Sequence, residues 1–336
     1  MFDGFLVTGA AGFIGSHFVK LLFKENPKAK VTVLDKLTYA GNPNNLKGLE
    51  KFNGYSFVKG DICDKKTVEK TFPGHEVIVN FAAESAVDRS IQEPDAFIKS
   101  DIFGTYTLLE ESRKQGIKKF IQISTDEVYG EALEKPFEET DTLMPRSPYS
   151  ASKTAADRLA YSYFTSYGLP VIITRSSNNY GPFAYPEKVI PLFITNILEG
   201  KKIPIYGTGK NSRDWLHVRD NCEAIKVLIE KGIDGEVYNI GAGNEKSVLE
   251  LVDAISKELN ASKDVINFVV DRPGHDRRYA LNCTKINSLG WKPKISFEKG
   301  IKETVKWYKE NEAYWKPLKK DLERFARGYW SKEAKK

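Results

Sequence analysis

Cysteine is scarce in this chain of 336 residues, and the three cysteines lie far apart. Cys63, Cys222 and Cys283 form no CxxC pair, so neither a disulfide framework nor a structural zinc site is expected. The four histidines share no metal-ligand spacing. We therefore expect no metal site, and the cysteine content is typical of a protein of the reducing cytoplasm.

Long hydrophobic runs are also missing. The sequence shows no basic segment followed by a signal-length apolar segment near its start, and no apolar run long enough to cross a bilayer. Charge of one sign does not dominate, because 51 Lys and Arg stand against 45 Asp and Glu, a formal net charge of +6. Nucleic-acid-binding proteins usually gather basic charge in a patch or tail. We expect neither a membrane nor a nucleic-acid partner.

Short β-branched runs alternate with helical stretches through the first half of the chain. The expected strands are Phe5 to Thr8, Lys30 to Asp35, Tyr55 to Lys59, Glu76 to Asn80, Lys119 to Ser124 and Pro170 to Arg175. The expected helices are Ile14 to Phe23, Lys65 to Phe72, Pro94 to Gln115 and Pro148 to Tyr167. Strands joined by helical crossovers pair in parallel, which predicts an α/β, doubly wound (Rossmann) sheet covered by helices on both faces.

The pattern changes after Pro182, where three further prolines punctuate the chain. A helix over Val218 to Lys231 and a strand over Glu236 to Ile240 then return to the sheet. The sequence thus predicts two interleaved domains. One is the sheet domain of residues 1–182 with 212–245, and the other is a smaller lobe of residues 183–211 with 246–336.

A glycine-rich turn, Gly9-Ala10-Ala11-Gly12-Phe13-Ile14-Gly15, directly follows the first strand and opens a helix. Such a turn lets the backbone approach a pyrophosphate, and the helix N-terminus offers free N–H groups. Asp35 ends the second strand, where its carboxylate can accept ribose hydroxyls and would repel a 2′-phosphate. We therefore predict NAD rather than NADP. Asp61-Ile62 and Phe81 to Ser85 follow later strands at the same edge of the sheet.

Two groups of polar residues point to chemistry. Tyr149 and Lys153 lie one helical turn apart on the same face, and an ammonium beside a phenol is expected to lower the pKa of the phenol. Thr125, Asp126 and Glu127 follow the strand from Lys119 to Ser124. Thr125 can bind the reacting oxygen beside Tyr149. Two adjacent carboxyls can divide into an acid and a base, because burial and like charge separate their pKa values.

Together these motifs resemble the extended short-chain dehydrogenase/reductase superfamily, and within it the dTDP-glucose 4,6-dehydratases. The further segments that carry the resemblance are Phe81 to Ser90, Ser177 to Pro182, Pro186-Glu187-Lys188, Pro204 to Gly207, Arg213-Asp214-Trp215 and Asp271 to Tyr279. The match runs over nearly the whole chain, and the last segment is the most specific.

The resemblance implies an internal redox cycle. Tyr149, helped by Thr125 and Lys153, would take the proton of the glucose 4-hydroxyl while hydride passes from carbon 4 to NAD. Glu127 would remove the proton of carbon 5, and Asp126 would protonate the departing 6-hydroxyl. The hydride would then return to carbon 6 and give a 4-keto-6-deoxy sugar nucleotide, with NAD regenerated in each turnover.

The resemblance also implies the remaining site residues and the partners. The NAD site would comprise Gly9, Gly12, Phe13, Ile14, Gly15, Asp35, Lys36, Leu37, Thr38, Asp61, Ile62, Phe81, Ala82, Ala83, Ser100, Tyr149, Lys153 and Asn179. The dTDP-glucose site would comprise Ser85, Thr125, Asn178, Lys188, Val189, Pro204, Tyr206, Arg213, Asn239, Arg272 and His275. Relatives form homodimers through the helices Pro94 to Gln115 and Pro148 to Tyr167.

Three alternatives stay open at the level of sequence. A 4,6-dehydratase could act on a UDP-, GDP- or CDP-sugar, because base choice depends on a few pocket contacts. A 4-epimerase or a UDP-glucuronate decarboxylase is the next alternative, although an epimerase has no use for the pair of Asp126 and Glu127. A catalytically silent NAD-binding protein would tend to lose Tyr149 or Lys153, and both are present.

Overall fold

A parallel sheet of seven strands forms the larger lobe of the computed structural model, which describes residues 2–272 and 274–333 and the side chains of all of these except 263 and 323–333. The strand order is β10-β6-β5-β4-β1-β2-β3. The bounds are β1 (Gly4–Thr8), β2 (Lys30–Asp35), β3 (Tyr55–Lys59), β4 (Val77–Asn80), β5 (Lys119–Thr125), β6 (Val171–Ser176) and β10 (Val237–Ile240). The predicted doubly wound sheet is confirmed, and the order reverses between β1 and β4, where ligands bind in such folds.

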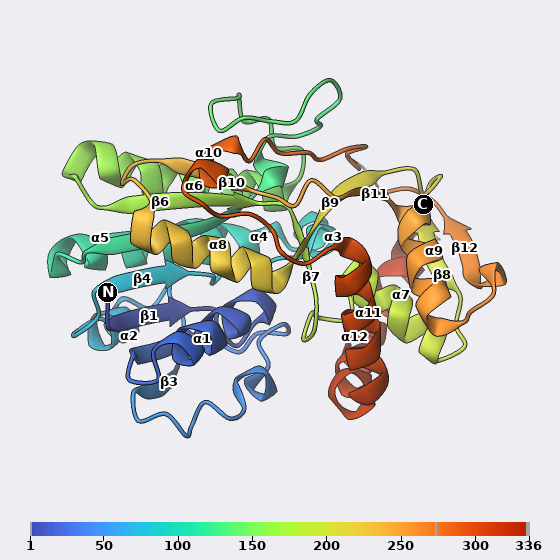
Figure 1. Cartoon of the computed structure of the whole chain (residues 1–336), viewed down its shortest axis with the longest axis horizontal. Coiled ribbons are helices and arrows are strands. Elements are labelled where there is room, and N and C mark those ends of the chain that lie inside the picture. Colours follow the sequence, from blue (N-terminus) through green and yellow to red (C-terminus); the bar gives the residue numbers. More distant parts are fainter. Residues whose placement is uncertain (1, 273, 334–336) are drawn as a thin grey trace.

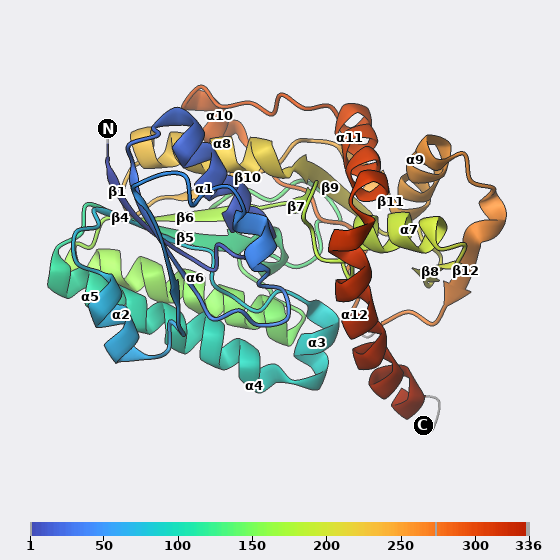
Figure 2. The ribbon, with the colours of Figure 1, turned by 90° about the horizontal axis from the view of Figure 1, so that it is seen from below.

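Helices cover both faces of this sheet (Figures 1 and 2). One face carries α1 (Phe13–Glu25), α8 (Val218–Lys231) and the short α10 (Thr284–Ser288), and the other carries α2 (Lys65–Thr71), α5 (Thr105–Gln115) and α6 (Pro148–Tyr167). Alternate residues of the strands feed the two cores: Val7 packs towards α1, and its neighbour Leu6 packs towards α5. This full burial explains why the strands are continuous apolar runs.

Helix α6 has the bounds that the sequence predicts, because strong signals mark both ends. The side chains of Ser147 and Ser150 form a capping box at its start, and Gly168 ends it in the left-handed conformation, with φ of 68°. The predicted helix from Pro94 to Gln115 is different. It begins as α4 (Pro94–Phe97), passes through a π-helical stretch (Ile98–Gly104) and continues as α5, after the separate α3 (Val87–Gln92).

Two small sheets and a helical cluster lie outside the large sheet, and the sheet of β7, β9 and β11 falls at the junction of the two proposed domains. One sheet has the order β11-β9-β7, and the other pairs β8 with β12. The bounds are β7 (Asn178–Tyr180), β8 (Ile203–Tyr206), β9 (Ser212–His217), β11 (Glu245–Ser247), β12 (Ile266–Val269), α7 (Val189–Leu198), α9 (Val248–Leu259), α11 (Phe297–Glu310) and α12 (Glu312–Glu333). Short 3-10 turns cover Pro43–Leu46, Asp126–Val128 and Lys263–Val265. In Figure 2, α11 and α12 lie between the two lobes.

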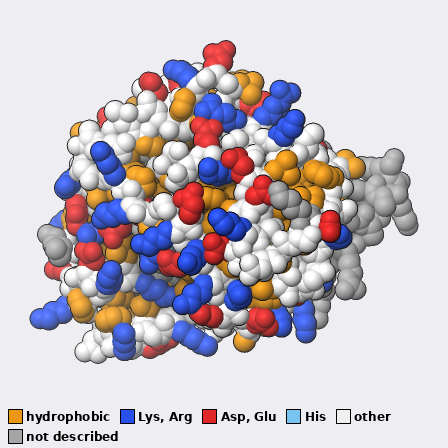
Figure 3. All heavy atoms as spheres, turned by 45° about the vertical axis from the view of Figure 1, so that its right-hand side comes forward, with side chains coloured by type: hydrophobic (Ala, Val, Ile, Leu, Met, Phe, Trp, Pro, Cys, Tyr) orange, Lys and Arg blue, Asp and Glu red, His pale blue; other side chains and the backbone are white. Residues whose placement is uncertain are grey.

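The surface mixes both signs of charge. On the face drawn in Figure 3, Lys and Arg side chains are interspersed with Asp and Glu. Within the described part of the chain, no helix has the length and apolar character needed to cross a membrane. The same residues contain no cluster of three or more potential metal ligands.

Candidate active site

A long cavity runs along the carboxyl edge of the sheet, and the glycine-rich turn forms one end of it. Gly9 has φ of +68°, and a Cβ atom there would lie 2.5 Å from the backbone nitrogen of Ala82. A side chain at this position would therefore force apart the two loops that follow β1 and β4. Gly12 is the N-cap of α1, and none of the described side chains caps this helix. Its first N–H groups thus remain available to an anion.

Asp35 lies beside this turn at the end of β2. Its carboxylate accepts hydrogen bonds from the backbone N–H groups of Ala11 and Leu37, both at 2.8 Å. Burial raises the pKa of this carboxyl, and the two N–H groups oppose the rise. The neighbouring Lys36 pairs with Asp61 at 2.7 Å across the same end of the cavity. This arrangement fits the adenosine end of NAD, because the carboxylate can accept ribose hydroxyls and disfavours a 2′-phosphate.

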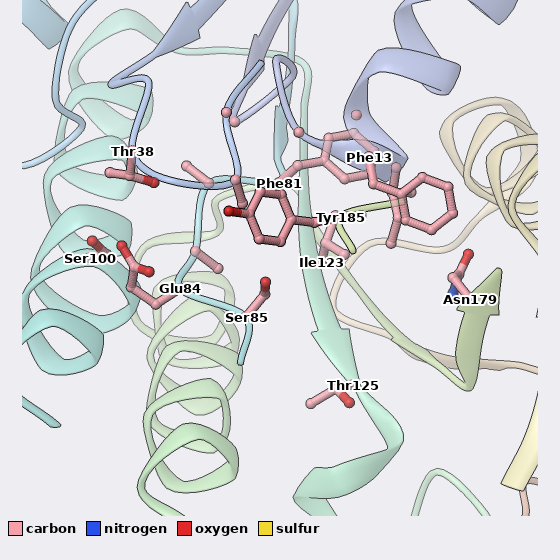
Figure 4. Close-up of a pocket in the computed structure, with 18 of the residues that line it drawn as sticks. Phe13, Thr38, Phe81, Glu84, Ser85, Ser100, Ile123, Thr125, Asn179 and Tyr185 are labelled. Carbon is pink, nitrogen blue, oxygen red and sulfur yellow. The ribbon is translucent and has the colours of Figure 1, made fainter. Parts of the chain in front are cut away.

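The Tyr149 and Lys153 pair lies further along the cavity, on the first turns of α6. The hydroxyl of Tyr149 hydrogen-bonds to Thr125, at the end of β5 (Figure 4 shows Thr125 there). Lys153 is buried, and its ammonium donates to the carbonyl oxygen of Ile123 at 2.6 Å. Tyr149, Thr125 and Lys153 all line the same cavity.

The predicted effect of Lys153 on Tyr149 is wrong, however. The pKa of Tyr149 lies well above its ordinary value, because burial comes first and the carboxyls of Glu127 and Asp101 add to it. Burial also lowers the pKa of Lys153, which Asp101 and Asp157 partly offset. Two carboxyls and the loss of water therefore outweigh the ammonium one turn away.

The buried Asp126 and the half-buried Glu127 form a carboxyl pair in the 3-10 turn after β5. Burial, and then the neighbouring Glu127, raise the pKa of Asp126 from 3.8 to about 8. One of its oxygens accepts from the Thr125 hydroxyl at 3.2 Å, and the other has no partner among the described residues. Asp126 therefore keeps its proton at neutral pH and can act as an acid.

Glu127 has a different electrostatic environment. Burial raises its pKa as well, but three cations, Arg272, Arg213 and Lys188, act in the opposite direction. All three are predicted nucleotide-sugar ligands, and they come from the smaller lobe or its junction. Burial is thus the largest cause at both carboxyls, but the next cause at Asp126 is the like charge of Glu127, whereas at Glu127 it is the cations.

The cavity gathers most of the predicted cofactor and sugar residues. Its lining includes Gly9, Gly12, Phe13, Ile14, Gly15, Asp35, Lys36, Thr38, Asp61, Ile62, Phe81, Ala82, Ala83, Ser85, Ser100, Thr125, Asp126, Glu127, Tyr149, Lys153, Asn178, Asn179 and Lys188. In Figure 4, Glu84, Ser85 and Ser100 lie on one side and Asn179 on the other. The side-chain oxygens of Asn178 and Asn179 are buried and have no partner among the described residues, which leaves them for a ligand.

Further predicted sugar-nucleotide residues lie in the smaller lobe beside the carboxyl pair. Tyr206 contacts the ring of His275, with ring centres 6.1 Å apart, and its hydroxyl donates to Asp88 at 3.3 Å. Arg272 pairs with the other oxygen of Asp88, also at 3.3 Å. Pro204 lies on β8, and Val189 opens α7 next to Lys188. The guanidinium of Arg213 donates to two backbone carbonyls and stacks 4.1 Å from the ring centre of Tyr279.

Eight predicted residues do not line this cavity: Leu37, Val189, Pro204, Tyr206, Arg213, Asn239, Arg272 and His275. Asn239 is fully buried on β10, where its amide accepts from Tyr129 and donates to the carbonyl oxygen of Phe137, so it is not placed to hold a nucleotide. Leu37 has φ of 58° and packs its side chain on the core beneath the sheet edge. Only its backbone N–H, through Asp35, belongs to the site.

Several cavity residues were missed by the sequence analysis. They include Glu84, Ile123, Ser124, Phe183, Tyr185 and Tyr314. Tyr314 comes from α12, and its hydroxyl donates to Asn45 at 2.7 Å. It was missed because the aromatic residues around it in the sequence suggest a role in core packing. Asp101 lies close behind the site. It is 1% exposed, accepts from Ser152 at 2.6 Å and has its pKa raised by burial to about 6.

Comparison with known proteins assigns the chain to a family. The model of the family described as GDP-mannose 4,6 dehydratase matches residues 6–304. A dTDP-glucose 4,6-dehydratase of Streptomyces niveus is 48% identical over 94% of this chain and 95% of its own. Among solved structures, DesIV, the dTDP-glucose 4,6-dehydratase of Streptomyces venezuelae with NAD bound, has a TM-score of 0.91 at 45% identity, over 94% of this chain and 99% of its own. The chain belongs to the dTDP-glucose 4,6-dehydratase family.

A second dTDP-glucose 4,6-dehydratase gives the same picture. The protein of Bacillus anthracis, solved in complex with NAD, is 50% identical with a TM-score of 0.87, over 94% of this chain and 99% of its own. The family and the fold that the glycine-rich turn, the Tyr149 pair and the carboxyl pair predict are thereby confirmed.

Proposed function

We propose that this protein is a dTDP-glucose 4,6-dehydratase, an NAD-dependent hydro-lyase that forms dTDP-4-keto-6-deoxyglucose. The observation that carries the proposal is the pair of Asp126 and Glu127 directly after Thr125 at the end of β5. Both carboxyls line the same cavity as Tyr149. A plain oxidation at carbon 4 needs only the hydroxyl, phenol and ammonium. Loss of water across carbons 5 and 6 needs in addition an acid and a base.

Each residue has its own part in this reaction. Tyr149, held by Thr125, would take the proton of the 4-hydroxyl. Because burial and nearby carboxyls raise its pKa in the free protein, added positive charge in the occupied site would have to lower that pKa for Tyr149 to act as the base. Glu127 removes the proton of carbon 5, which the ketone at carbon 4 makes acidic, and would return a proton to carbon 5 when hydride reaches carbon 6. Asp126, protonated at neutral pH because its pKa is about 8, gives its proton to the departing 6-hydroxyl. Both groups are carboxylic acids, so their different roles as acid and base would come from their different environments.

The residues along the sheet edge would hold NAD. When bound there, NAD supplies an acceptor for the hydride of carbon 4 and a donor of hydride to carbon 6. The turn from Gly9 to Gly15 and the N-terminus of α1 suit the pyrophosphate, Asp35 suits the adenosine ribose, and Asn179 offers a buried oxygen without a partner among the described residues. NAD is present in two solved relatives of the family, which supports this choice of cofactor.

The nucleotide end of the substrate would lie against the smaller lobe. Arg213, Arg272 and Lys188 converge on the carboxyl pair, and together they can neutralise a diphosphate through charge-assisted hydrogen bonds. Asn178, Ser85, Val189, Pro204, Tyr206 and His275 complete the proposed substrate site. On this basis the NAD domain comprises residues 1–182 with 212–245, and the substrate lobe residues 183–211 with 246–336, with Tyr314 reaching back into the cofactor cavity.

We also propose a cytoplasmic homodimer. Large apolar side chains are exposed on the two helical segments that the family resemblance assigns to the dimer: Ile98 is 55% exposed, Phe103 45%, Tyr161 39% and Tyr167 58%. A second copy of the chain would cover them. Cys63, Cys222 and Cys283 are all free, which suits a reducing compartment.

The test is incubation of the purified protein with dTDP-glucose and, in parallel, with UDP-, GDP- and CDP-hexoses. The expected product from dTDP-glucose is a 4-keto-6-deoxy sugar that absorbs ultraviolet light in alkali, with no net NADH. Accumulation of stoichiometric NADH, or clean conversion to the galactose epimer, would overturn the proposal. Equal or better turnover of another nucleotide hexose would support the dehydratase reaction but overturn dTDP-glucose as the substrate.

A further inference from the structure

Three segments that line the cofactor cavity meet outside it at one arginine. Tyr39 lies between the lining residues Thr38 and Ala40, in the loop after β2. Arg89 lies on α3, which follows the lining residues after β4. Glu187 lies between the lining residues Tyr185 and Lys188, in the turn that precedes α7. No two of these segments are neighbours in the sequence.

Arg89 bridges the other two side chains. Its guanidinium carbon lies 3.6 Å from the centre of the Tyr39 ring, and its Nε donates to Glu187 at 2.9 Å. The side chains of Arg89 and Glu187 are only 16% and 11% exposed, so water screens their attraction little. The stacking on Tyr39 adds a cation–π contact to the ion pair.

Two further contacts cross the same gap. The rings of Tyr39 and Tyr185 meet edge to face, with centres 5.4 Å apart. The ammonium of Lys188 donates to the carbonyl oxygen of Ser85. Tyr185 itself lines the cavity and is drawn in Figure 4 with Ser85 and Thr38. The contacts thus join the adenosine side of the cavity, the loop after β4 and the entry to the smaller lobe.

The bridge is not what folding alone would favour. The second carboxylate oxygen of Glu187 is buried and has no hydrogen-bond partner among the described residues. An unpaired buried oxygen costs stability, and such groups recur where function requires them. Separation of the three segments would break the ion pair between Arg89 and Glu187.

We propose that Tyr39, Arg89 and Glu187 form a clamp that slows the release of NAD. This inference rests on the proposed function insofar as NAD is the cofactor. Retention suits a reaction in which the hydride taken from carbon 4 returns to carbon 6 of the same sugar, since escape of the reduced cofactor between the two transfers would end the cycle. The clamp holds the walls of the cavity and takes no part in the chemistry.

The experiment measures how fast bound NAD leaves the full-length protein. Wild type, R89Q and E187Q are loaded with NAD, freed of excess by rapid gel filtration, and sampled for bound NAD over time. We expect each variant to release NAD about tenfold faster, the change that corresponds to about 1.4 kcal/mol. The double variant R89Q/E187Q should release it no faster than the single variants, because both changes break one pair.

A matched ion pair far from the cavity provides the control. Lys119 at the start of β5 pairs with Asp234 at 2.6 Å, at the opposite end of the sheet, and the lysine is 12% exposed. D234N should release NAD at the wild-type rate. Release at the wild-type rate from R89Q and E187Q, or equally fast release from D234N, would overturn the clamp.

Two further outcomes remain interpretable. If circular dichroism shows that E187Q does not fold, Y39L replaces it, since loss of the ring removes the stacking but no charge, and it too should speed release. If folded Y39L and R89Q both release NAD at the wild-type rate, the clamp is refuted. If the wild-type protein does not bind NAD, the proposed cofactor fails together with the clamp. If it binds NAD and the variants release it at the wild-type rate, only the clamp fails.

Discussion

Replacement of Asp126 by Asn should make the protein more stable while removing the proposed acid. Asp126 is 3% exposed, and burial with the adjacent Glu127 raises its pKa from 3.8 to about 8. In the unfolded chain the same carboxyl ionises near its ordinary value. The folded state therefore has to bind a proton that the unfolded state releases, and this cost grows as the pH rises from about 4 to about 8.

The size of the effect follows from the two pKa values. At pH 7, about 3 pH units above the pKa of the unfolded chain, keeping Asp126 protonated lowers the free energy of unfolding by about 4 kcal/mol. Below pH 4 this cost almost vanishes, because the carboxyl is protonated in both states. Asn cannot ionise, so D126N escapes this cost, although its amide N–H groups would lack a partner and offset about 1–3 kcal/mol of the gain. The offset does not depend on pH. The advantage of D126N should thus grow by about 4 kcal/mol between pH 4 and pH 8.

Thermal unfolding of wild type and D126N at several pH values is the assay. The melting temperature of the variant should rise relative to wild type by several degrees as the pH rises from 4 to 8, while turnover of dTDP-glucose is lost. D141N is a suitable control, because Asp141 lies in the same part of the chain and is only half-buried. A difference in melting temperature that stays constant over this pH range would refute the buried, protonated Asp126.

Other variants test the remaining assignments. E127Q should still form reduced cofactor from dTDP-glucose but fail to lose the 6-hydroxyl, which rapid mixing would follow by nicotinamide absorbance; full turnover would exclude Glu127 as the base. Turnover by wild type should fall above about pH 8 as Asp126 loses its proton, which a pH–rate profile measures. G9A should lose NAD and about 1–3 kcal/mol of stability, since φ of +68° and a 2.5 Å approach to Ala82 leave no room; retention of NAD in a binding assay would contradict it. I98E should shift the protein from dimer to monomer in sedimentation, and an unchanged dimer would place the interface elsewhere.

The sheet domain could be predicted because its signals are local. β2 and β3 have the bounds that the sequence predicts, since each is a short run rich in β-branched or aromatic residues. α6 is bounded by a capping box at Ser147 and a left-handed Gly168. Each of these signals acts within a few residues of the element that it marks, so a single sequence carries it.

The smaller lobe could not be predicted in this way. β8 pairs with β12 across some sixty residues of chain, with Ile203 opposite Ile266, and no local pattern encodes that choice of partner. The π-helical stretch around Asp101 was missed for a related reason. Its side chains keep a helical rhythm on both sides, so the sequence reads as one continuous helix.

The electrostatics of the site required the fold. YxxxK places Lys153 one turn from Tyr149, and this spacing predicts a lowered phenol pKa. The structure shows the reverse, because burial and the carboxyls of Glu127 and Asp101 act on the same phenol from other segments. Asn239 shows the same limit. Its place at a strand end suggests a ligand, while its amide is already held by Tyr129 and Phe137.

The division between acid and base is made where the two lobes meet. Burial raises the pKa of both carboxyls; Glu127 adds to the rise at Asp126, whereas Arg272, Arg213 and Lys188 oppose the rise at Glu127. Those same cations are the proposed ligands of the substrate diphosphate. A bound diphosphate would compensate their charge and so raise the pKa of Glu127, which makes a stronger base once substrate is present. The smaller lobe would thereby couple recognition of the nucleotide to removal of the carbon 5 proton, a coupling that a bare dinucleotide fold with Tyr149 and Lys153 alone does not offer.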